Sequence, residues 1–240
     1  MDWFNTSFGW FGLVAALVLL VLMFGTDRLR SDASISRWRD LTWLSWTAVT
    51  IYLLHNAEEY AIDSYGQIYA FPAAMCANFG HGPYPDCPVP PMFFTAVNVP
   101  MFWFVGPIAA LLSRRHPLIG LTLYSVISTN AAVHIVGALT TGSYNPGLFT
   151  AALLFVPLAA WAGYALFGKH GLSYQAMAFL IVLGVVAHAV LAGSIFALRT
   201  GAIGASAAAA LQCLNAALLL AAPWFAEHFG VRIAYRDDEP

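Results

Sequence analysis

The residues of this chain that could do chemistry stand together in the segment His55-Asn56-Ala57-Glu58-Glu59. On a helix, His55 faces Glu58 at i+3 and Glu59 at i+4, so one imidazole and two carboxylates share a face. The segment lies near the end of a long apolar run, where a carboxylate is costly to bury and usually marks a functional site. We therefore expect an intramembrane site built around these residues.

Glu58 and Glu59 must also be reconciled with each other, because two neighbouring carboxylates repel in a low dielectric unless a proton or a cation neutralises them. A protonated glutamic acid could donate a proton at neutral pH, and a metal-bound water beside a glutamate could become a nucleophile. A pair that merely bonds across helices is the structural alternative, although neutral glutamine would serve that purpose at lower cost.

The composition places these residues in a membrane. The chain has 240 residues, of which 60% are hydrophobic and 9% charged, and its mean hydropathy is +0.71. Such a chain has no polar exterior for a soluble fold and is typical of a multi-span membrane protein. The net charge of -2 and the lack of a Lys/Arg-rich tract argue against nucleic acid as a partner.

Apolar runs predict the elements that must position the site. We count seven, which favours an all-α, polytopic membrane helical bundle with about seven transmembrane helices, forming a single domain over residues 1–240. The amino terminus lacks a basic segment before its apolar run, so we interpret this run as a span and not as a signal peptide. The runs cover residues 8–24, 41–62, 92–113, 117–139, 148–167, 174–198 and 202–225.

The cationic residues predict the orientation of the bundle. All but Arg199 fall in the first, third and fifth connections or in the carboxyl-terminal tail, so the positive-inside rule puts the N-terminus outside and the C-terminus in the cytoplasm. We expect a bacterial inner (plasma) membrane. The cytoplasmic set consists of Arg28, Arg30, Arg37, Arg39, Arg114, Arg115, Lys169, Arg232 and Arg236.

The outside connection, at about 63–91, is the one long loop. It carries Cys76 and Cys87, which an oxidising compartment would pair in a disulfide, the alternative being two unpaired thiols. The loop is either a lid over an outward-facing site or a linker that the disulfide fastens. Cys213, in the last run, is expected to be a small buried core residue.

Polar residues in separate runs fall at one depth. With a helix rise of ~1.5 Å per residue from the cytoplasmic end, the intramembrane histidines and their polar companions lie ~20–26 Å up, in the outer third of the hydrocarbon core. Alone, each histidine would more often be a hydrogen-bonded core residue. Together with a carboxylate, three imidazoles suit zinc or iron. The residues at this depth are His55, Glu58, Glu59, Asn98, Asn130, His134 and His188.

We assign roles within this set as hypotheses. Its metal ligands are predicted to be His55, Glu59, His134 and His188. Glu58 points about 100° away from Glu59 around the helix and is assigned to proton transfer. Asn130, at i, i+4 from His134, could orient that ring or contact substrate.

The chain resembles the bacterial membrane-protein family named for its H-x-x-E-E motif. The resemblance is carried by His55 to Glu59, by the N-x-x-x-H from Asn130 to His134, and by Tyr144-Asn145-Pro146-Gly147. It implies several spans and an enzymatic activity, and supplies no substrate. A weaker similarity, of His55 and Glu59 to the H-x-x-x-E acid/base pair of emopamil-binding sterol isomerases, implies that such a pair can move protons without metal.

Several functions are argued against by missing residues. The only lysine, Lys169, lies in a loop, so no span can form a retinal Schiff base, and no nucleotide-binding glycine pattern occurs. We predict an enzyme with metal-assisted chemistry, most simply hydrolysis, on a lipid or other apolar substrate. A metal-free isomerase or cyclase is the first alternative. A proton- or ion-coupled transporter is the second, weakened by the lack of detectable repeats.

Overall fold

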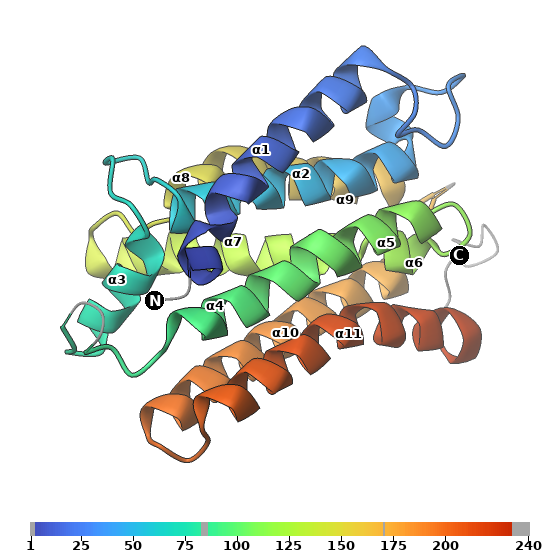
Figure 1. Cartoon of the computed structure of the whole chain (residues 1–240). Coiled ribbons are helices and arrows are strands. Elements are labelled where there is room, and N and C mark those ends of the chain that lie inside the picture. The colour runs from blue at the N-terminus through green and yellow to red at the C-terminus, as the bar shows by residue number, and fades with distance from the viewer. Residues whose placement is uncertain (1–2, 83–85, 170, 232–240) are drawn as a thin grey trace.

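In the computed structural model, the described residues 3–82, 86–169 and 171–231 form a bundle of helices (Figure 1). Arg232 and Arg236 of the predicted cytoplasmic set lie outside the described residues, as do positions 83–85 of the outside loop. Each of the seven predicted runs is helical. The helices are α1 Trp3–Gly25, α2 Leu41–Tyr60, α3 Ala70–Asn78, α4 Pro91–Asn98, α5 Gly106–Leu112, α6 Pro117–Gly120, α7 Thr122–Thr141, α8 Leu148–Thr150, α9 Val156–Leu166, α10 Tyr174–Arg199 and α11 Ala205–Phe229.

Two of the membrane-length helices contain a wider π-helical stretch. Val99–Val105 (η2) joins α4 to α5, and Ala151–Phe155 (η3) joins α8 to α9. Pro100 lies inside the first stretch and Pro157 follows the second; a proline ring displaces the carbonyl one turn earlier and lacks the N–H that would bond it. Both helices continue through these stretches without ending, as Pro91–Leu112 and Leu148–Leu166.

Within the described residues, six helices are long and apolar enough to cross a membrane, which identifies an integral membrane protein: Trp3–Gly25, Pro91–Leu112, Pro117–Thr141, Leu148–Leu166, Tyr174–Arg199 and Ala205–Phe229. The twenty-residue helix α2 does not meet that measure of hydropathy. Sixteen of its residues are buried, including His55, Glu58 and Glu59. Because its neighbours shield it, α2 does not need a lipid-facing apolar surface. The count of seven spans stays a prediction.

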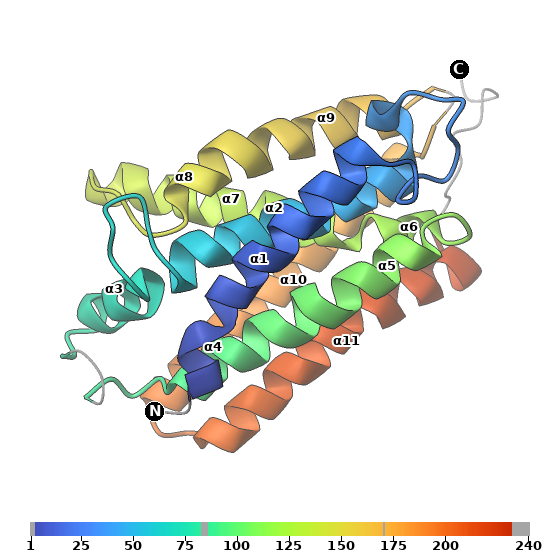
Figure 2. The same ribbon diagram turned by 45° about the horizontal axis from the view of Figure 1, so that its top comes forward.

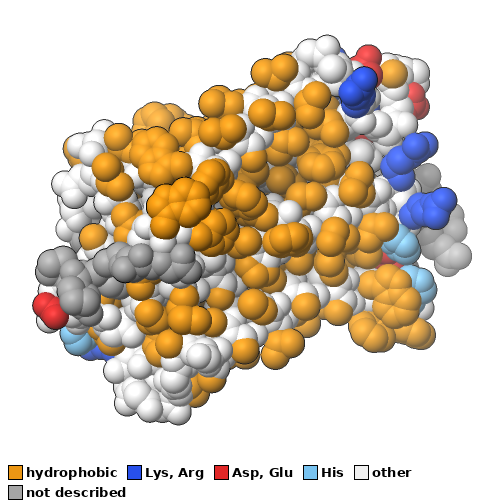
Figure 3. All heavy atoms as spheres, in the orientation of Figure 1, with side chains coloured by type: hydrophobic (Ala, Val, Ile, Leu, Met, Phe, Trp, Pro, Cys, Tyr) orange, Lys and Arg blue, Asp and Glu red, His pale blue; other side chains and the backbone are white. Residues whose placement is uncertain are grey.

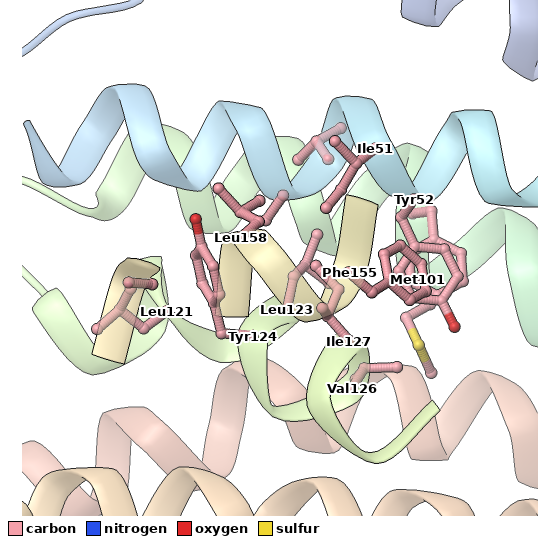
Figure 4. Close-up of a cluster of buried hydrophobic side chains, with 14 of the residues drawn as sticks. Ile51, Tyr52, Met101, Leu121, Leu123, Tyr124, Val126, Ile127, Phe155 and Leu158 are labelled. Carbon is pink, nitrogen blue, oxygen red and sulfur yellow. The ribbon is translucent and has the colours of Figure 1, made fainter. Parts of the chain in front are cut away.

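Helix α2 is held in the middle of the bundle. It runs beside α1 and α9, while α10 and α11 lie on the far side of α4 and α5 (Figure 2). Buried side chains pack together where α2 faces α7 and the η3–α9 segment (Figure 4). Among them are Ile51 of α2, Ile127 of α7 and Phe155 of η3. This packing fixes the height and rotation of α2 and with them the position of the H-x-x-E-E segment.

The surface agrees with a bilayer environment. In Figure 3, apolar side chains cover most of the visible face, and most of its Lys and Arg side chains gather at one end of the bundle. Several large apolar side chains on α7 and α10 are exposed, including Leu139 and Phe196. Cys213 is exposed too, so the expectation that it would be a buried core residue is wrong. Small residues in a membrane helix can face lipid as well as protein.

The connection at 63–91 is more ordered than a long loop. It contains α3, and the predicted disulfide is present between Cys76 at the end of that helix and Cys87, with the two Cα atoms 5.6 Å apart. Phe71 of α3 packs against Tyr60 and Phe94. The disulfide and these rings fasten α3 across the end of the bundle at which α2 ends (Figure 1).

Candidate functional site

Three of the predicted residues converge on one point. Glu59 and His55 come from the last two turns of α2, and His134 comes from α7. The Glu59 Oε1 atom lies 3.5 Å from His55 Nε2 and 3.4 Å from His134 Nε2. The possible ligand atoms of the three residues all lie within 4.8 Å of one another, and all three residues are buried.

The first imidazole is oriented by Thr150. Its hydroxyl oxygen lies 2.5 Å from Glu58 Oε2 and 2.8 Å from His55 Nδ1. A carboxylate can only accept, so the single Thr150 hydroxyl proton is donated to Glu58, and the Nδ1–H of His55 is donated to Thr150. With its proton on Nδ1, His55 turns Nε2 toward Glu59, and in the neutral form of the ring that atom offers a lone pair.

The second imidazole is oriented by Asn145. Its Nδ2 donates to the backbone carbonyl of His134 at 3.0 Å, which identifies the nitrogen side of the amide, because a carbonyl only accepts. The amide oxygen then faces His134 Nδ1 at 2.5 Å, so that nitrogen carries the proton. His134, like His55, turns its Nε2 atom toward Glu59, and in the neutral form of the ring that atom offers a lone pair.

Glu58 does not face this point. Its oxygens accept from the Tyr144 hydroxyl at 2.9 Å, from the backbone N–H groups of Phe149 and Thr150 at 3.1 and 2.7 Å, and from the Thr150 hydroxyl. Burial raises the pKa of Tyr144 to about 12, and the Glu58 carboxylate acts in the same direction, so the phenol stays a donor at neutral pH. Glu58 thus holds the first N–H groups of the 148–166 helix, where a negative charge is favoured.

Gly147 lets the chain turn onto the two rings. Its φ of +97° is a left-handed conformation that side chains disfavour. A Cβ atom there would lie 2.6 Å from His134 Cε1 and 2.7 Å from His55 Cε1. Only glycine lets the backbone pass this close, and the backbone in turn keeps both rings from rotating away.

Three possible ligand atoms meet here, one carboxylate oxygen and the Nε2 atoms of two imidazoles whose Nδ1 atoms carry protons. The separations of 3.4 and 3.5 Å exceed an ordinary N–H···O bond of ~2.7–3.2 Å, and His55 Nε2 is buried without a hydrogen-bond partner. Two ligand atoms bound at ~2.0–2.2 Å to one tetrahedral zinc lie ~3.3–3.6 Å apart. The donor set and its spacing therefore fit a metal ion.

A cavity of about 320 Å³ borders these atoms. Glu59 and His134 line it, as do Asn130 and His188. A deeper chamber of about 70 Å³ shares Glu59, Asn130 and His188 with it, and aromatic rings make much of the remaining wall, among them Phe93 and Phe102. A metal held by the three residues would therefore have an open side toward a space that could hold a substrate.

Two predicted site residues lie on the cavity wall instead of among the ligand atoms. His188 donates its Nδ1–H to the Gly184 carbonyl at 2.9 Å and is outside the group of possible ligands. In the part of the chain that the structure describes, that group has three members, without the fourth that we expected. Asn130 does not orient His134, since Asn145 does. Its buried Oδ1 has no hydrogen-bond partner.

Sequence reasoning missed Thr150, Asn145 and Gly147 as site residues. The signal was present in part, because Asn145 and Gly147 belong to the Tyr144-Asn145-Pro146-Gly147 segment. That segment is one of the motifs that carry the family resemblance, but its sequence does not show that it folds back over the two imidazoles.

Comparison with known proteins supports the resemblance. Residues 46–162 match a family model described as "Protein of unknown function with HXXEE motif". This stretch holds His55, Glu58 and Glu59 together with the partners from α7 and the 143–150 turn. A search of curated proteins and a search of solved structures found no match.

Proposed function

The chain belongs to the HXXEE-motif family, whose function is unknown, and we propose that it is a metal-dependent intramembrane enzyme. His55, Glu59 and His134 would hold a zinc or iron ion, and the fourth position would face the cavity. A single observation carries the proposal. Two imidazoles, each with its Nδ1 proton committed to a fixed partner, aim their Nε2 atoms at one carboxylate oxygen.

The committed Nδ1 protons favour a metal over a metal-free acid/base pair. In metal sites, a histidine almost always donates its second N–H to a carboxylate, carbonyl or similar group, which fixes the tautomer and raises ligand basicity. Both rings have such a partner here. Without a metal, two lone pairs and a carboxylate would share a buried pocket with only protons to neutralise them, at a substantial desolvation cost.

Hydrolysis is the reaction that the arrangement supports best. His55, His134 and Glu59 would hold the ion, and a divalent metal on such a set would supply an activated water for hydrolysis. A nearby base would take the proton of this water as its oxygen bonds to the carbon or phosphorus of the substrate. That proton would pass to the leaving group as the bond between the leaving group and the same atom breaks.

We assign the proton transfer to His188 and not to Glu58. Every oxygen of Glu58 is occupied by donors from the 144–150 segment, so this carboxylate serves to position Thr150 and thereby His55. His188 lines the cavity, and its Nδ1–H is donated to Gly184, which leaves Nε2 as a proton acceptor. A neutral histidine is the commonest general base at neutral pH.

Elemental analysis of the detergent-purified chain tests the proposal. We expect about one equivalent of a transition metal, the stoichiometry of a single three-ligand site, and its loss in His134→Ala. The matched control is His188→Ala, which removes another intramembrane histidine but should keep the metal. A folded wild-type protein without metal would favour the isomerase or cyclase instead. Uptake of an unchanged substrate into proteoliposomes would favour the transporter.

The same proposal covers the location. We place the chain in a bacterial inner membrane with the site near the outer face. Support comes from the helical spans and from the disulfide in the connection opposite most of the cations.

A further inference from the structure

The way in which α7 and α10 cross gives the cavity a side that faces the bilayer. The two helices touch backbone to backbone at Gly184, where an added Cβ would overlap the Ser125 carbonyl. From this contact both helices run toward the end of the bundle where α3 lies, and they draw apart on the way (Figures 1 and 2). A glycine contact of this kind allows close packing of membrane helices at one level only.

The 320 Å³ cavity lies in the diverging part. Val133 and Gly137 of α7 line one side of it, and His188 and Leu191 of α10 line the other. Val133 is 55% exposed and Leu191 is half-buried, so the boundary between cavity and lipid is thin here. The apolar character of these side chains would let a hydrocarbon chain pass between the two helices.

The inner wall has a different chemistry. Asn130 has a buried Oδ1 without a partner, and His188, whose Nδ1–H is donated to the Gly184 carbonyl, lines the same wall. Both lie on the boundary between the outer cavity and the aromatic chamber, next to Glu59. Buried polar groups without partners are costly unless a ligand or water satisfies them. The cavity is thus apolar toward the bilayer and polar beside the possible metal ligands.

We infer that the substrate is an amphipathic membrane lipid that enters sideways between α7 and α10. Its hydrolysable polar group would lie beside Glu59 and His134, within reach of Asn130, and its hydrocarbon would extend along Val133 and Leu191 into the bilayer. This inference rests on the proposed function and adds the class of substrate and its route. A water-soluble substrate would instead have to arrive from the aqueous side, past Tyr144 and α3.

Photolabelling from vesicles tests the route. The probe is a diacyl phosphatidylcholine with a diazirine next to the ester end of one acyl chain, incorporated in phosphatidylcholine vesicles with the full-length protein. We expect adducts at Phe71 and Asn130, which border the inner chamber. Leu191→Trp should fill the opening and lower these adducts about tenfold, equivalent to ~1.4 kcal/mol. Val185→Trp places the same side chain on α10 at a position 54% exposed and outside both cavities, and should leave them unchanged.

The contrary outcomes are distinct. Adducts confined to lipid-facing surfaces, or equal losses in both tryptophan variants, would overturn the lateral route. Strong labelling of Phe71 and Asn130 by a water-soluble diazirine, with none from the lipid probe, would overturn the lipid substrate. Metal content measured on the same samples separates the two proposals, because a metal-loaded protein without lipid labelling contradicts only this inference. Lipid labelling of a metal-free protein contradicts only the proposed function.

Discussion

Asn145 and His134 hold each other in two directions. The ring donates its Nδ1–H to the amide oxygen at 2.5 Å, and the amide nitrogen donates to the carbonyl of the same histidine at 3.0 Å. Asn145 thus fixes both the tautomer of the His134 ring and the position of the His134 backbone. Most of the predictions below test whether such supporting contacts serve a metal.

Asn145→Leu should weaken metal binding while keeping the bulk of the side chain. Loss of an outer partner of a metal-bound histidine typically lowers affinity 10–100-fold, and competition with a chelator would measure this. The control is Asn78→Leu, because Asn78 lines the same cavity without contacting either ring. Equal affinities in both variants would mean that Asn145 does not orient a ligand.

Thr150 can be tested through its hydroxyl alone. Thr150→Val removes the groups that accept from His55 and donate to Glu58, so we expect a loss of metal affinity of about tenfold or more. Thr150→Ser keeps the hydroxyl and should bind nearly as well as the wild type. If valine and serine behaved alike in the chelator assay, the hydroxyl would have no part in orienting His55.

Gly147→Ala should disturb the site more than the turn. Its new Cβ would press on both imidazoles, at 2.6 and 2.7 Å from their Cε1 atoms. Gly142→Ala is the matched control, because Gly142 also has a positive φ, +65°, but nothing lies within 4 Å of its Cβ position. We expect both variants to lose some stability and only Gly147→Ala to lose metal. Metal retention by Gly147→Ala would show that the rings can move without consequence.

The two glutamates should separate in their effects. The Glu58 carboxylate accepts four hydrogen bonds, and in Glu58→Gln one of its two oxygens becomes an NH2 group that cannot accept them. Hydrogen bonds to a charged group are worth roughly 1.5–3 kcal/mol each. We expect Glu58→Gln to lower the free energy of unfolding in mixed micelles by about 2–3 kcal/mol. Glu59→Gln should leave the fold intact and release the metal. A Glu58→Gln variant that kept its stability and its metal but lost turnover would restore our first assignment, with Glu58 as the proton-transfer group.

The orientation of the bundle can be read from its cysteines. In a Cys213→Ser background, Cys76 and Cys87 should resist a membrane-impermeant thiol reagent until the disulfide is reduced, and then react from the outer side. Sealed vesicles of both orientations provide the comparison. Reaction only from the cytoplasmic side would reverse the predicted topology.

The sequence was enough to predict the helices and the level of the site. Apolar runs set the positions of the long helices within a few residues, because a bilayer requires such runs. Counting residues from one end also placed His55, Glu59 and His134 at one depth, since the rise of a helix is constant. These three residues do meet.

Depth does not give the direction in which a side chain points. His188 is at the predicted height but lies on the cavity wall, because the rotation of α10 is set by its contact with α7 at Gly184. Thr150 and Asn145 could not be assigned in advance, since their roles depend on how the 143–150 turn folds back over α2. The expectation for Cys213 was wrong for the same reason, because hydropathy does not distinguish small residues that face lipid from small residues that face the core.

The anchoring of Glu58 has a consequence for biogenesis. Its partner Thr150 is 92 residues further along the chain, so α2 leaves the ribosome well before its carboxylate has any donor to bind. An acidic side chain costs ~2.5–3.5 kcal/mol to insert at the centre of a lone span, and Glu58, near the end of α2, bears a smaller part of that cost. Newly synthesised α2 should therefore insert only weakly into the bilayer. In nascent chains that stop before residue 147, α2 should be accessible to water. We expect α2 to become stably inserted once the 148–166 helix is complete and its first N–H groups bind Glu58.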